Sequence, residues 1–236
     1  MSTMFAMARK TRHIETTSAA VVWNRPPRAS RGPHPAHSRD GIARTAILVA
    51  DREGIEAVSM RRIAAELGGG AASLYRYIKK KDELLDLMMD AVIAEQKLPK
   101  ASGNWRKDLR NIAHRSRSMI LRHPWMIELP AFRSSFGPDS LRWLEFSLKV
   151  IDELGLNIDE MLVIAHTLFA FVRGYTAGEI AEREAQKNSP LGQEEWIATR
   201  AHITRAIVES GKFPMFCRVV RDAKAPHDPR MAEKGF

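Results

Sequence analysis

Residues 59–81 read SMRRIAAELGGGAASLYRYIKKK, and this stretch decides how the first part of the chain folds. Apolar residues recur at i, i+3, i+4 and i+7 from Met60 to Leu67, which predicts one buried face of a short helix. Three glycines at 68–70 then end that helix, because glycine adopts turn dihedrals without a steric cost. A second short helix is predicted over residues 71–77, with Leu74 and Ile78 as inward anchors, and the Ser59 hydroxyl is expected to cap the first helix. Two short helices joined by a glycine-containing turn form a helix-turn-helix.

The same stretch is strongly basic. Six arginines and lysines accompany a single acid, Glu66, so the local excess is five positive charges. Cationic side chains and phenol hydroxyls are groups that contact phosphates and base edges in DNA complexes. A solvated basic face is the plainer alternative, and a P-loop is disfavoured because no Gly-Lys-Ser/Thr follows the glycines. We therefore predict a DNA-binding surface made by these residues: Arg61, Ala71, Ala72, Ser73, Tyr75, Arg76, Tyr77 and Lys81.

Residues 63–85, IAAELGGGAASLYRYIKKKDELL, resemble the DNA-binding signature of the TetR family of transcriptional repressors. The resemblance covers residues 38–95 and keeps the family's spacing from the Leu-Gly turn to the Leu-Leu pair after the lysines. Gly69 and Gly70 depart from the pattern, since the family usually has a Val-like residue and a small polar cap there. This departure predicts a weak N-cap for the recognition helix.

The resemblance implies a homodimeric repressor whose two recognition helices enter successive major grooves of a near-palindromic DNA operator. Tyr75 and Lys81 match family positions that contact the DNA backbone. The same resemblance implies a small hydrophobic inducer that releases the operator, a cytoplasmic and nucleoid-associated location, and no enzymatic activity.

Composition agrees with these expectations. The chain of 236 residues carries 37 basic and 28 acidic side chains, a net charge of +9 that favours a polyanionic partner. The single Cys217 excludes an intrachain disulfide and suits a reducing cytoplasm. The longest apolar run, 161–172, is short for a bilayer span, and no secretory signal is visible, so we expect no membrane partner. Helical periodicity dominates, which predicts an all-α fold.

We expect a three-helix DNA-binding domain followed by a helical ligand-binding and dimerisation domain. The second domain resembles the tetracycline-repressor-like C-terminal domain through WRKDLRNIAHRSRSMILRHPW and FVRGYTAGE. Its longest predicted helix runs over 158–186, starting at an Asn157-x-x-Glu160 capping box. The expected organisation is a disordered basic extension, the helix-turn-helix domain, the ligand and dimer domain, and a C-terminal tail, at 1–37, 38–98, 99–212 and 213–236.

Two segments leave alternatives open. The proline-rich residues 1–37 are a basic arm that touches DNA, a dispensable extension, or the product of a start codon assigned too early. At the other end, the family usually has one more amphipathic helix beyond the position of Phe236. Either the sequence is truncated, or the dimer relies on the helices at 158–186 and 190–210.

An inducer pocket is apolar with a few convergent polar groups. For each candidate pocket residue named at the end of this paragraph, the alternative is an ordinary core or surface role. In tetracycline-sensing members of the family, a ligand-holding Asn and Phe align with Ile112 and Ser116 here, which argues against a tetracycline–magnesium ligand. The candidates are His114, Met119, Phe132, Trp143, Phe146, His166, Phe169 and Arg173.

The sequence contains no Gly-x-Ser-x-Gly motif, no plausible Cys–His pair and no metal-spaced histidines such as His-Glu-x-x-His. We therefore predict no catalytic site, no metal and no cofactor. The rival interpretation from another class is a helical small-molecule carrier or enzyme with an incidental basic face. A carrier or enzyme would bind DNA without sequence preference, whereas a repressor prefers one site.

Overall fold

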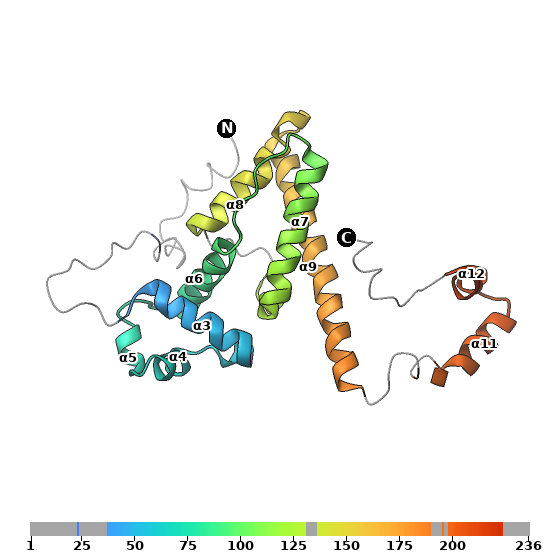
Figure 1. Cartoon of the computed structure of the whole chain (residues 1–236), viewed down its shortest axis with the longest axis horizontal. Helices are drawn as coiled ribbons and strands as arrows, with labels where there is room; N and C mark the ends of the chain where they lie inside the picture. The colour runs from blue at the N-terminus through green and yellow to red at the C-terminus, as the bar shows by residue number, and fades with distance from the viewer. Residues whose placement is uncertain (1–22, 24–36, 131–135, 190–194, 196–197, 224–236) are drawn as a thin grey trace, which may run out of the picture. The chain divides into compact units, whose positions relative to one another are not determined.

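The computed structural model describes residues 23, 37–130, 136–189, 195 and 198–223. All regular elements in these ranges are helical, as predicted (Figure 1). The described chain forms two compact units that meet within one long helix, the first ending at Ala170 and the second beginning at Phe171. The boundary expected at residue 98 on sequence grounds therefore lies inside the first unit.

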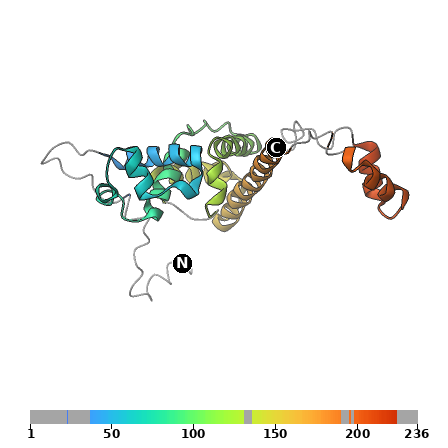
Figure 2. The same ribbon diagram turned by 90° about the horizontal axis from the view of Figure 1, so that it is seen from below.

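The DNA-binding region consists of four α-helices and a short 3-10 helix: α3 (Arg39–Glu53), η1 (Ile55–Ala57), α4 (Met60–Glu66), α5 (Ala71–Leu74) and α6 (Lys81–Ala94). Helix α3 packs against α6 and α4, and α4 packs against α5. These helices lie together in the blue to teal part of Figure 2. Ile42, Ile63, Leu74 and Leu84 are fully buried between them. The spacing of apolar residues therefore identified the core of this region correctly.

Local capping fixes where these helices begin and end. Ser38 Oγ accepts a hydrogen bond from Gly41 N at 3.0 Å, and Ser59 Oγ accepts one from Arg62 N at 3.1 Å. Each serine therefore satisfies an N–H group that the first helical turn leaves without a partner. Gly54 ends α3 at φ 85°, a left-handed conformation that favours glycine.

The rest of the first unit carries α7 (Trp105–Arg122), η2 (Pro124–Glu128), α8 (Pro138–Lys149), η3 (Asp152–Leu154) and the first part of α9 (Ile158–Asn188). Helix α8 packs against α6, and η2 packs against both α3 and α7. The predicted capping box at the start of α9 is confirmed, because Asn157 N donates to Glu160 Oε2 and Glu160 N donates to Asn157 Oδ1.

Helix α9 is long and apolar enough, by length and composition alone, to pass a test for a membrane span. The run at 161–172 was judged too short on sequence grounds, but the helix continues through small and apolar residues beyond it. Core helices of soluble proteins pass the same test, so this property alone does not indicate a membrane protein.

The second unit contains the rest of α9, then α11 (Ala201–Glu209) and α12 (Pro214–Asp222), which pack against each other. Helix α12 forms inside the segment expected to be a tail. Pro214 suits the first helical position, and exposed apolar side chains at Phe216, Val219 and Val220 recur at helical spacing. This amphipathic pattern was present in the sequence but was overlooked.

Candidate nucleic-acid interface

We call residues 71–77 the recognition segment. Two buried side chains, one within the segment and one directly after it, anchor it to the core. Leu74 and Ile78 are fully buried, while the chain between and around them faces solvent. The α-helix proper spans Ala71–Leu74, and hydrogen bonds from Tyr77 N and Ile78 N to Leu74 O carry the helical turn onward. The segment predicted at 71–77 is therefore a short helix extended by a turn.

The turn before this segment has the weak cap that its glycines predicted. Gly70 is the N-cap of α5 and makes no side-chain cap hydrogen bond. Gly68 has φ 70°, which requires the left-handed conformation available to glycine. The Ser73 hydroxyl donates a hydrogen bond to Gly70 O at 2.7 Å, so it stabilises the turn but supplies no acceptor for the first N–H groups of the helix.

Several predicted DNA-binding side chains are exposed on this segment. Tyr75 is 47% exposed, Arg76 and Ala72 are exposed, and Tyr77 is half-buried. Arg61 on α4 and Lys81 at the start of α6 are also exposed. Ala71 and Ser73 are half-buried beside them.

A buried carboxylate that sequence reasoning left out orders the lysine-rich turn. Glu83 is 3% exposed, and its Oε2 accepts a hydrogen bond from Lys79 N at 2.8 Å. This hydrogen bond holds the backbone at Lys79 in place. The side chains of Lys79, Lys80 and Lys81 therefore extend from an ordered turn.

His37 extends the surface toward the N-terminus. Its ring lies edge-on to Tyr77, with ring centroids 6.5 Å apart. The chain that precedes α3 therefore approaches the recognition segment. The proposed role of residues 1–37 as a DNA-binding arm otherwise concerns residues outside the described ranges, apart from Trp23 and His37.

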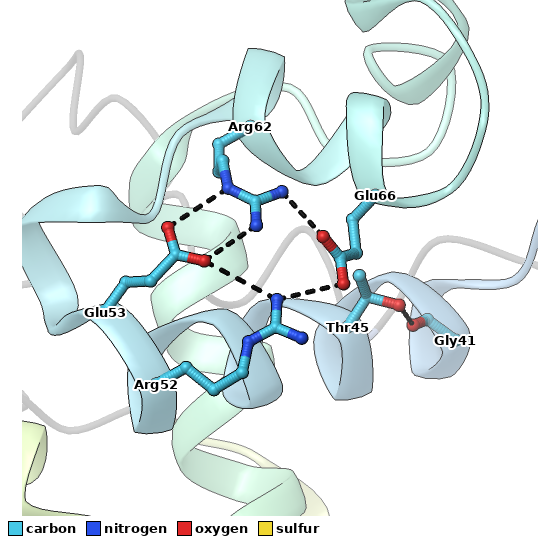
Figure 3. Close-up of polar contacts among 6 residues, drawn as sticks. All are labelled: Gly41, Thr45, Arg52, Glu53, Arg62 and Glu66. Carbon is cyan, nitrogen blue, oxygen red and sulfur yellow. Dashed lines mark hydrogen bonds and ion pairs between the residues drawn. The ribbon is translucent and has the colours of Figure 1, made fainter.

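Arg62 is committed to acids within the DNA-binding region (Figure 3). Its guanidinium donates to Glu53 through Nε and Nη2, at 3.1 and 2.7 Å, and to Glu66 Oε2 through Nη1, at 2.7 Å. Arg52 Nη2 donates to Glu66 Oε1 at 2.9 Å. This four-residue network joins α3 to α4, so Arg62 should not be counted with Arg61 as a cation available to DNA.

The network sets a pH dependence of stability. Hydrogen bonds from Arg62 hold the pKa of Glu53 and of Glu66 below the ordinary glutamate value of 4.5, and Arg52 adds to the effect at Glu66. Carboxylates whose pKa is lowered by folding stabilise the fold above the unfolded pKa, and this contribution is lost as pH falls through the folded pKa.

Arg62→Gln should therefore lower the urea midpoint of unfolding at pH 7, and the difference from wild type should shrink as pH falls below 4.5. The effect should be small and weaker in salt, because the groups are solvent-exposed. Arg61→Gln is the matched control and should leave the midpoint unchanged at every pH. A constant difference for Arg62→Gln between pH 7 and pH 3 would contradict this assignment.

The candidate ligand residues occupy different environments. Met119 on α7 is buried, His114 and His166 are exposed, and Phe132 lies outside the described residues. Burial lowers the pKa of the Arg173 guanidinium, which belongs to the second unit. Half-buried aromatic rings remain on α8 and α9 of the first unit: Trp143, Phe146 and Phe169.

Within the described ranges, no group of three or more His, Cys, Asp or Glu side chains is placed to hold a metal ion. The helix-turn-helix region presents exposed cationic and phenol side chains on a buried helical core, which suits a binding surface.

Comparison with known proteins identifies this frame. Residues 42–88 match the model of the bacterial regulatory proteins of the TetR family, and residues 98–227 match the tetracyclin repressor-like C-terminal domain. The chain is 33% identical over 208 residues to the HTH-type transcriptional repressor DrrR1 of Streptomyces coeruleorubidus, covering 87% of this chain and 77% of that protein.

A second relative, an HTH-type transcriptional regulator of Saccharopolyspora erythraea, is 34% identical over 177 residues, or 73% of this chain and 75% of its own. Among solved structures, the TetR family protein ActR of Streptomyces coelicolor in complex with actinorhodin has a TM-score of 0.67 and 27% identity. The match covers 84% of this chain and 91% of ActR. The chain belongs to the TetR family and is one of its helix-turn-helix transcriptional repressors, a bacterial cytoplasmic regulator and not an enzyme.

Proposed function

We propose that the chain represses transcription as a homodimer that places one recognition segment in each of two successive major grooves of a near-palindromic operator. The observation that carries this proposal is the exposed set of Tyr75, Arg76 and Lys81 above the buried anchors Leu74 and Ile78. Residues 71–77 read base edges, while Arg61, Lys81 and the tyrosine hydroxyls hold phosphates.

An apolar face of α9 supports the dimer. Four small residues recur every three or four positions along one side of the helix, and all four are exposed within one chain: Ala170, Gly174, Gly178 and Ala181. A Cβ atom added at Gly174 or Gly178 would meet nothing within 4 Å. Such a small-residue stripe lets two helix backbones approach closely, so we assign it to the twofold contact.

The inducer is a small and mostly hydrophobic molecule bound among α7, η2, α8 and the part of α9 that belongs to the first unit. ActR, the related protein, has been solved with actinorhodin, which supports a ligand of this kind here. Apolar area supplies most of its affinity, at roughly 25 cal/mol per Å² before the costs of binding are subtracted. By linkage, inducer and operator weaken each other's binding by the same factor.

Lys81→Ala tests the DNA contact. Removing this exposed ammonium should weaken binding to operator and random DNA alike, because a phosphate contact carries no sequence information. The slope of log affinity against log salt should fall by about one. Fluorescence anisotropy with labelled duplexes over a salt series measures both quantities. Tyr75→Phe should weaken both DNAs without changing that slope. Unchanged affinity and slope for Lys81→Ala would mean that the docking geometry is wrong.

Phe169→Ala tests the ligand site. The half-buried ring lies on α9 within the first unit, so its removal should raise the actinorhodin concentration needed for operator release. Operator affinity without ligand should stay unchanged. Phe216→Ala, an exposed ring on α12, is the matched control, and thermal unfolding checks for core damage. If folded Phe169→Ala protein releases DNA at the wild-type concentration, Phe169 is a core or dimer residue instead.

A further inference from the structure

A buried histidine fastens the end of α7 to two helices of the DNA-binding region. His123 is the C-cap residue of α7 and is 3% exposed. Its Nδ1 lies 2.8 Å from Asp51 Oδ1 on α3, and its Nε2 lies 3.3 Å from Glu95 Oε2 at the C-cap of α6. One imidazole thus bridges carboxylates from two different helices, all within the first unit.

Two neighbouring side chains reinforce this bridge. Trp125 is 2% exposed, and its Nε1 donates to the same Asp51 Oδ1 at 2.7 Å. Arg122 Nη1 donates to Glu95 Oε2 at 3.0 Å. We call these five residues, Asp51, Glu95, Arg122, His123 and Trp125, the α7 joint. Charge-assisted hydrogen bonds at such distances are strong and directional, and both partners of the half-exposed Asp51 carboxylate, His123 and Trp125, are buried.

We propose that the α7 joint positions the helix-turn-helix, here called the DNA reader. The joint fixes the angle between the reader and α7, and this angle sets the operator spacing that the protein prefers. This inference rests on the dimeric operator binding proposed above. A dimer gains affinity on a full operator because its second reader is already held near its half-site. This gain in affinity depends on how little the orientation of each reader varies. The α7 joint restricts that orientation because it bonds to both α3 and the end of α6.

A merely structural role can be told apart from positioning by DNA geometry. Binding to an isolated half-site needs one folded reader, whereas binding to the full operator needs two readers at the correct separation. One base pair inserted between half-sites rotates one of them by roughly 34–36° relative to the other. Loosening the joint should therefore weaken full-site binding and widen spacing tolerance, while half-site binding stays the same.

The test measures anisotropy for three duplexes: the operator, the operator with one inserted base pair, and a single half-site. Wild type should lose at least about tenfold in affinity on insertion. Asp51→Ala should bind the operator about tenfold more weakly than wild type, since it removes the oxygen that Trp125 Nε1 and His123 Nδ1 share and so loosens the joint. The affinity of Asp51→Ala should fall less than about threefold when the base pair is inserted. Its half-site affinity should stay within about twofold of that of wild type.

Two further variants keep the result clear. Trp125→Phe keeps an aromatic ring in the core and removes the N–H donor together with part of the indole, so it should widen spacing tolerance even if Asp51→Ala fails to fold. Glu56→Ala removes an exposed acid on η1 of the same region and should match wild type on all three duplexes.

The outcomes separate this inference from the proposed function. If wild type binds the full site no more tightly than the half-site, dimeric operator recognition itself fails. If wild type prefers one spacing and the folded variants keep that preference, the joint does not position the reader. Loss of half-site and full-site binding by the same factor would also overturn positioning, because it would indicate damage to the reader.

Discussion

Gly137→Ala is expected to destabilise the chain by about 2–4 kcal/mol, a large effect for one methyl group. Gly137 is the N-cap residue of α8 and offers no capping side chain. Asp90 on α6 takes over that function: its carboxylate accepts from Ser140 N and Ser140 Oγ, both at 2.8 Å, and from Asp139 N at 3.3 Å. A carboxylate at a helix N-terminus also interacts favourably with the helix dipole.

A side chain at Gly137 cannot coexist with this cap. A Cβ added there would overlap the Asp90 carboxyl group and would lie 2.8 Å from Asp90 Cβ. The acid is 3% exposed, so displacing it leaves a buried charge without its donors. Loss of the cap costs about 1 kcal/mol, and the buried unpaired carboxylate adds about 1–3 kcal/mol.

Urea unfolding of both variants measures the effect. Gly69→Ala is the matched control, because its Cβ would meet Ser73 Oγ at an ordinary 3.6 Å, and its midpoint should equal or exceed that of wild type. In an Asp90→Ala background, Gly137→Ala should cost less than in wild type, because the cap is already lost and only the contact with the Cβ of residue 90 remains. A wild-type midpoint for Gly137→Ala would contradict the proposed cap.

Gly174→Leu is expected to have opposite effects on the helix and on the dimer. Gly174 is exposed on α9, and leucine is a better helix former than glycine by about 0.8 kcal/mol, so the folded chain should not lose stability. Leucine would, however, block close approach of the small-residue stripe of the partner. The dissociation constant of the dimer should rise by about a hundredfold or more, as for a central interface residue.

Sedimentation equilibrium gives the dimer constant, and circular dichroism gives the helix content. Operator affinity should fall together with dimerisation, while half-site affinity should be retained. Gln186→Leu places the same side chain elsewhere on α9 and should stay dimeric. A fully dimeric Gly174→Leu protein would show that the stripe lies outside the twofold contact, whatever its pattern along the helix.

The parts of the structure that sequence predicted well depend on neighbours within one turn. Ser59 and the Asn157–Glu160 box cap their helices through residues three positions away, as their spacing indicates. The buried anchors Leu74 and Ile78 follow from periodicity in the same way. Local hydrogen bonds and one helix face are encoded within a short window, so one sequence suffices to find them.

The parts that sequence missed join distant residues. Asp51 and His123 are 72 positions apart, and Asp90 and Ser140 are 50 positions apart. No periodicity links such pairs, because their meeting depends on how whole helices pack. Arg62 entered only the charge count of the basic stretch, and its pairing with Glu53 on another helix could not be found from spacing, although its i+4 partner Glu66 could.

The most direct test of the central claim is a binding titration of the full-length protein on DNA flanking its own gene. Anisotropy would be followed from about 50 to 200 mM salt, with random duplexes of equal length for comparison. The account predicts one preferred, near-palindromic site, a steep salt dependence and a clear margin over random DNA. Equal affinity for all fragments at every salt concentration would contradict it, and would leave the basic helix-turn-helix surface without its proposed role.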